Sequence, residues 1–131
     1  MLLSENPSLV QLGLENGLDT SLSNNKPIKY ASSNGYTETV RLLLSDPRVN
    51  PAIENNYPIG MASNGGHTEV VKLLLNNPHV DPSDDDNYAI IIAAEKGHFE
   101  IVKLLQMMHV LILELKITKL FAPHLTKDIP K

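Results

Sequence analysis

Two histidines occupy matching places in this 131-residue chain, and imidazole is a common metal ligand. His67 and His98 lie 31 residues apart, but neither a carboxylate nor a third histidine shares that spacing. A zinc site needs three or four converging ligands. The remaining histidines, His79, His109 and His124, are isolated along the chain. We therefore predict no metal site, and a packing role for His67 and His98.

An acidic run, Asp84–Asp86 with Asp81 just before it, concentrates negative charge in one loop. Its carboxylates could bind Ca²⁺, could contact a basic partner, or could simply be a solvated loop tip. The usual calcium-binding loop has a central glycine and a terminal glutamate, and this run has neither. Calcium binding is therefore disfavoured, whereas a partner contact and a solvated loop both remain open.

Serine, histidine and aspartate are all present, but they do not form a catalytic pattern. The chain has no G-x-S-x-G nucleophile elbow and no glycine-rich phosphate loop. It has no cysteine, which excludes thiol nucleophiles, thiolate metal sites and disulfides. We predict that the protein is not an enzyme and holds no cofactor. A hydrolase is only a distant alternative.

Composition and charge narrow the class of protein further. Hydrophobic residues make up 42% of the chain and charged residues 20%, which is enough for one packed domain. The net charge is -4, whereas nucleic-acid binding needs clustered lysine and arginine. The apolar run Leu104–Leu113 is too short to span a bilayer, and no secretory signal is visible. We expect an intracellular, cytoplasmic protein without membrane contact.

The elements that must position these residues are internal repeats. A shift of 31 residues aligns Asn24–Ala52 with Asn55–Ser83, with 16 identities in 29 pairs. A second shift aligns Asn55–Leu75 with Asp86–Gln106, with 11 identities in 21 pairs. Proline and glycine recur in the same register. The chain is therefore predicted to be a repeat array.

Each repeat predicts a helix, a tight turn, a second helix and an extended loop. Pro27 and Pro58 suit the start of the first helix, and a glycine such as Gly66 suits its left-handed end. The second helix carries an apolar stripe, with Val71 and Leu74 in one unit. A residue type that accepts positive φ stands at the reversal before each first helix, at Asn24, Asn55 and Asp86.

The pattern weakens at both ends of the chain. Leu9–Asn25 aligns with Val40–Asn56, so the chain starts at the second helix of a repeat, with Asn6 as its cap. After Gln106 an apolar segment fits either a strand or a helix, and we favour a helix that continues the last repeat. The predicted single domain comprises a half-repeat at 1–23, repeats at 24–54, 55–85 and 86–108, and an atypical tail at 109–131.

The apolar tail needs to be covered in water. We expect it to fold back over the third repeat as a cap, which favours a monomer. Pairing of the tail with a second chain, to give a dimer, is the alternative.

The segments Gly66–Leu75 (GHTEVVKLLL) and Gly97–Leu105 (GHFEIVKLL) resemble the ankyrin repeat. The loops DPRVNP and NPHVDP make the array similar to the shorter, 31-residue variety. The resemblance covers roughly residues 9–106 and implies an all-α solenoid of about three helix-turn-helix units, with loops that project as β-hairpins. It also implies a concave protein-binding surface, no catalysis, and a histidine that holds the helix–helix turn. The T-P-L-H start of the family is replaced by KPIK, YPIG and YAII.

We therefore predict a non-catalytic protein–protein interaction module or scaffold that presents its loop tips and first-helix faces to a protein partner. This surface is polar and acidic, which favours a basic partner. A structural fragment of a longer ankyrin array, without a function of its own, is the alternative. By their place in the repeat, the residues expected to contact the partner are Ser23, Asn25, Ser33, Asn34, Ile53, Glu54, Asn56, Asn64, Asp84, Asp85, Asn87 and Glu95.

Overall fold

The computed structural model describes residues 6–121, and within that range the chain forms helices and no strands. A first helix, α1 (Pro7–Glu15), belongs to the half-repeat. Three helical pairs follow, and the second helix of the last pair is much longer than the others. These pairs are α2 (Leu22–Asn34) with α3 (Thr37–Leu44), α4 (Ile53–Gly65) with α5 (Thr68–Leu75), and α6 (Asp84–Lys96) with α7 (Phe99–Phe121).

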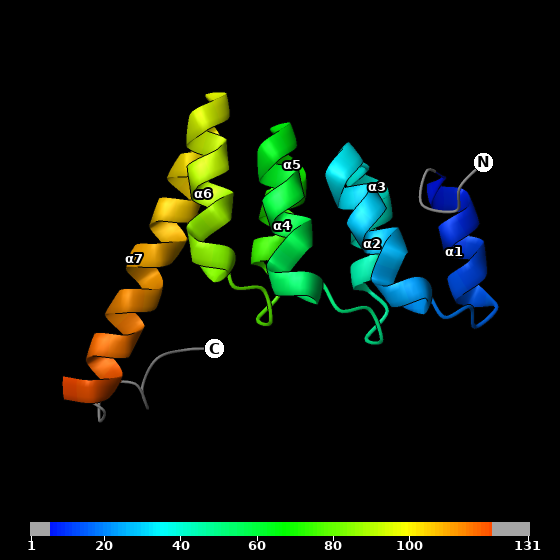
Figure 1. Ribbon diagram of the computed structural model, residues 1–131. Coiled ribbons are helices and arrows are strands. Elements are labelled where there is room, and N and C mark those ends of the chain that lie inside the picture. Colours follow the sequence, from blue (N-terminus) through cyan, green and yellow to red (C-terminus); the bar gives the residue numbers. More distant parts are fainter. Residues whose placement is uncertain (1–5, 122–131) are drawn as a thin grey trace.

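The helices stack side by side in two layers. The first helices α2, α4 and α6 contact one another in one layer, and α1, α3, α5 and α7 form the other. Figure 1 shows the row from α1 to α7, with the connecting loops hanging at one edge. The described residues thus form the all-α solenoid that the repeats predicted.

The core consists of the same positions in each repeat. Ile28 and Ile59 of the first helices are 0–1% exposed, and Leu43 and Leu74 of the second helices are fully buried. In the third repeat Ile101 is buried, whereas Ile90, which matches Ile59, is only half-buried. The predicted helical stripes are confirmed, and their burial declines where the stack ends.

Each first helix begins with a short left-handed turn. Three successive residues, at 23–25, 54–56 and 85–87, have φ between 52° and 64°. This conformation costs most side chains about 1–2 kcal/mol each, and Asn and Asp tolerate it best. All but two of these nine residues are Asn or Asp. The positive φ predicted for Asn24, Asn55 and Asp86 is confirmed. The implied β-hairpins are wrong for the described residues, because these turns replace them.

A buried carboxylate attaches the half-repeat to the first full repeat. Asp46 is 5% exposed and accepts hydrogen bonds from Thr20 Oγ1 (2.8 Å) and Arg48 Nη2 (2.9 Å). Arg48 Nη2 also donates to the carbonyl of Leu18 at 2.7 Å. The hydrogen bonds from Arg48, followed by those from Thr20, hold the pKa of Asp46 well below its usual range. At the start of α1, Asn6 Oδ1 accepts from the N–H of Ser8 (2.9 Å), which confirms the predicted cap.

The tail continues α7 as a single helix as far as Phe121, which confirms a helix over a strand. The fold-back over the third repeat is wrong for the described part of the tail, because α7 runs on past the stack and leads away from it (Figure 1). Its apolar side chains stay open to solvent, from Met107 (69% exposed) to Phe121 (81%). Within residues 6–121 no helix combines the length and apolarity needed to cross a bilayer. His124 and the rest of 122–131 lie outside the described residues.

Candidate partner-binding surface

The predicted contact residues lie in two groups, one on or beside the left-handed turns that begin the first helices and the other at the far ends of those helices. The second group comprises Ser33, Asn34, Asn64 and Glu95. Ser23, Asn34, Glu54, Asp85, Asn87 and Glu95 are exposed; Ser33, Ile53, Asn64 and Asp84 are half-buried. Asn25 and Asn56 are only 9% and 6% exposed, so the exposed surface position expected for them is wrong.

Asn25 and Asn56 are buried because each one satisfies the backbone of the following loop. Asn25 Oδ1 accepts from the N–H of Asn50 at 2.8 Å, and Asn56 Oδ1 accepts from the N–H of Asp81 at 2.9 Å. Buried backbone donors need such partners. These two bonds form a ladder that fixes each turn against the loop that ends its own repeat. Its third position, Asn87, is exposed and stands at the open end of the stack.

The repeated histidines also join neighbouring repeats. His67 Nε2 donates to the carbonyl of Ser33 and His98 Nε2 to that of Asn64, each at 3.1 Å. Glycine makes room for the ring, since a Cβ at Gly35 would lie 2.4 Å from His67 Nδ1. The packing role predicted for both histidines is confirmed. Among residues 6–121, no three histidine or acidic side chains are placed to share a metal ion.

Negative charge accumulates toward the C-terminal end of the row of turns. In the second repeat, Glu54 Oε1 is 3.1 Å from Lys29 Nζ and also accepts from Asn24 Nδ2 at 2.9 Å. In the third repeat, no ion pair with another described residue engages Asp84, Asp85 or Asp86. A hydrogen bond, rather than an ion pair, holds Asp84 in place, since its Oδ2 accepts from Asn56 Nδ2 at 2.9 Å.

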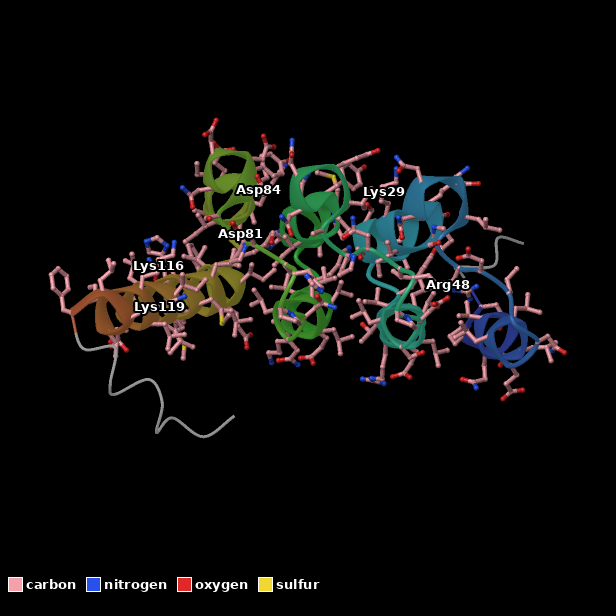
Figure 2. All side chains as sticks on the ribbon, turned by 90° about the horizontal axis from the view of Figure 1, so that it is seen from below. Lys29, Arg48, Asp81, Asp84, Lys116 and Lys119 are labelled. Atoms are coloured by element: carbon pink, nitrogen blue, oxygen red, sulfur yellow. The ribbon has the colours of Figure 1, made fainter. Side chains whose placement is uncertain are left out.

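A cleft of about 230 Å³ opens between the turns of α4 and α6. Tyr57 and Tyr88 line it together with Glu54, Asp84 and Asp85. Gly60, in the interior of α4, allows Tyr88 to approach, because a Cβ there would lie 3.0 Å from the tyrosine ring. Carboxylates next to aromatic rings favour cationic groups by charge attraction and by cation–π contact. Asp81 and Asp84 lie at the base of α6 beside this cleft (Figure 2).

The comparison with protein families identifies the fold. A model of ankyrin repeats in three copies matches residues 28–112, so the chain belongs to the ankyrin-repeat family. Ankyrin repeats are generally protein–protein interaction modules, and the family is generally not enzymatic. No curated protein matches the chain.

The sequence held a signal for the ladder that the predicted site missed. Asn25, Asn56 and Asn87 are the same residue in all three repeats, whereas Ser23, Glu54 and Asp85 differ at one matching position. In an array, a position that keeps its residue in every unit serves the stack, since each unit contacts its neighbours in the same way.

Proposed function

We propose that the protein is a non-catalytic interaction module, a scaffold, that binds a basic segment of a protein partner at the acidic end of its row of turns. One observation carries this proposal. Asp84, Asp85 and Asp86 have no ion pair within the described structure, and Asp84 and Asp85 line an open cleft together with Tyr57 and Tyr88.

The stack would favour binding by fixing this surface in advance. Asn56 anchors Asp84, and the left-handed turn sets the direction of Asp85 and Asp86. Few side chains then lose freedom when the partner binds, which lowers the entropic cost of association. The carboxylates would speed the encounter with a basic partner, and the cleft would admit one lysine or arginine side chain.

The other parts of the proposal follow from composition. Without cysteine, a catalytic motif or a basic patch, the chain has no feature that favours catalysis or nucleic-acid binding over partner binding. We also propose that the protein acts in the cytoplasm.

The test removes the negative charges at the turn and keeps the size of the side chains. In the triple variant Asp84→Asn, Asp85→Asn and Asp86→Asn, each side chain keeps its size and its tolerance of positive φ. Capture of partner proteins from a lysate by the immobilised chain should fall about tenfold or more at low salt, and its salt dependence should flatten. The matched control, Glu38→Gln with Glu69→Gln and Glu100→Gln, removes three exposed carboxylates from the second helices and should leave capture unchanged.

Two results would contradict the proposal. If the triple asparagine variant captures the same proteins as the parent in the same amounts, the acidic turn is not the binding surface. If the control variant loses capture equally, only net charge matters. Circular dichroism of both variants verifies that the fold is kept.

A further inference from the structure

The extension of α7 beyond the stack carries large apolar side chains over most of its surface, interrupted by His109, Glu114, Lys116 and Lys119. Between residues 107 and 121 most of the large hydrophobic side chains are 44–81% exposed, whereas Met108 and Ile112 are half-buried. A monomer rarely leaves a contiguous apolar patch larger than roughly 300–600 Å². Covering by the tail itself is ruled out as far as Phe121, since the described tail is one unbroken helix.

A groove of about 1040 Å³ lies between this extension and the third repeat. Its walls are apolar, with Ile90 and Ile91 of α6 on one side and Leu105, Val110 and Leu113 of α7 on the other. Its two rims carry opposite charges, with Asp81 at the loop and Lys116 on the helix (Figure 2).

We propose that a second copy of this chain fills the groove, and that the two α7 extensions pack antiparallel about a twofold axis near Ile112 and Leu113. Each copy then supplies the helix that covers the groove of the other. This surface adjoins the cleft between α4 and α6 and shares Asp81 with it, but its apolar walls on α6 and α7 lie outside that cleft. Dimer formation is therefore tested separately from the proposed function.

The charges along α7 make the groove complementary to itself. Asp81 and Asp86 line one shallow hollow together with His109, so this end is negative. Lys116 lies seven residues further on, about 10 Å along the helix, and Lys119 follows one turn later. An axis between Ile112 and Leu113 places Lys116 of one copy level with His109 of the other. Within one chain, hydrogen bonds from Ser83 and, more weakly, the charge of Lys116 lower the pKa of Asp81, so Lys116 faces Asp81 before a second copy binds. Across the axis, Lys116 then meets the hollow beside His109 that Asp86 lines.

The surface also approaches the size of a stable dimer interface. A standard interface uses about 800 Å², or about 20–30 residues, from each partner. Fifteen residues line the groove, and Ile117, Leu120 and Phe121 extend the same helix beyond it with 54–81% exposure. A short basic peptide would neutralise the acidic rim but would leave the apolar walls of the groove exposed to solvent. A second copy would neutralise the rim and also cover the walls.

Sedimentation equilibrium of the full chain, from micromolar to submillimolar concentration, tests this proposal. The mass should rise from that of the 14.5-kDa chain to twice that value and then stay constant. Leu113→Glu and Ile91→Glu, one on each wall, should each raise the dissociation constant about 100-fold, because an unpaired charge is buried at the interface. Both residues are exposed in the single chain, at 44% and 50%, so these variants should fold.

Leu111→Glu is the matched control. Leu111 lies on the same helix and is 49% exposed, but it does not line the groove. This variant should dimerise like the parent. The proposal is overturned if the parent stays monomeric throughout, if the mass grows beyond two chains, or if Leu111→Glu weakens the dimer as much as Leu113→Glu does.

Discussion

At the scale of the residue, three asparagines at matching places differ only in what surrounds them. Asn25 and Asn56 are buried against the loop that ends their own repeat, and Asn87 is exposed because α7 continues as a helix where that loop would follow. Asparagine suits both demands of this position, since it tolerates positive φ and its side chain accepts a backbone hydrogen bond.

Replacing Asn56 by alanine should separate the stability that its hydrogen bonds contribute from the cost of its positive φ. Asn56→Ala loses the bonds to Asp81 and Asp84 and should lower the free energy of unfolding by about 1–3 kcal/mol more than Asn87→Ala does. Asn87→Ala is the matched control, because φ is 62° at Asn56 and 64° at Asn87 and the backbone strain is therefore shared. Urea unfolding of both variants measures the difference. Equal losses of unfolding free energy in the two variants would show that the hydrogen bonds of Asn56 contribute nothing to stability.

Asp46 should make the attachment of the half-repeat sensitive to acid. Hydrogen bonds, first those from Arg48, keep the folded-state pKa of Asp46 below its ordinary value of about 4. The stability that this carboxylate contributes is therefore present above that pH and is lost as the pH falls toward the lower, folded-state pKa.

The variant Asp46→Asn should be less stable than the parent at pH 7 by about 1–3 kcal/mol. Asparagine is also the residue at the matching position of the next repeat, Asn77. As the pH falls below about 4, the two unfolding free energies should converge, because the parent loses the contribution of its carboxylate and the variant has none to lose. Chemical unfolding between pH 7 and pH 3 measures this. A difference that does not change with pH would contradict the assigned role.

At the scale of the element, local sequence was enough to predict most of the helices. Proline, glycine and apolar spacing recur with the repeat, so each unit supports the assignment of the others, and even the helical start of the tail was predicted. The β-hairpins were not correct, because the family resemblance suggested them while the residues at 23–25, 54–56 and 85–87 favour a left-handed turn. The burial of Asn25 and Asn56 was also missed, since it depends on a loop 25 residues further along the chain that packs against the turn.

Leu74 tests the stacking of these elements. It is fully buried on α5, and Leu74→Ala should lower the free energy of unfolding by about 2–5 kcal/mol because it leaves a cavity. About three repeats are near the minimum for a stable array, so this variant could unfold altogether at moderate temperature. Leu111→Ala, at a half-exposed leucine outside the stack, is the control and should melt close to the parent. Equal melting of Leu74→Ala and the parent would contradict the stacked core.

At the scale of the whole molecule, the stack ends in two neighbouring surfaces of different chemistry. The acidic turns and their tyrosine-lined cleft suit a basic partner, and the groove beside α7 suits a second apolar helix. The acidic loop was visible in the sequence. The groove was not, because the apolar tail alone does not say whether it folds back or projects, and that depends on the helix remaining unbroken past Gln106.

The central claim is that the acidic end of the row of turns contacts the partner. Photo-cross-linking from a single position tests it most directly, with the cross-linking residue placed at Asp85 in one variant and at Arg41, exposed on α3, in another. We expect adducts with a partner protein from position 85 and none from position 41. Adducts from position 41 without any from position 85 would contradict it.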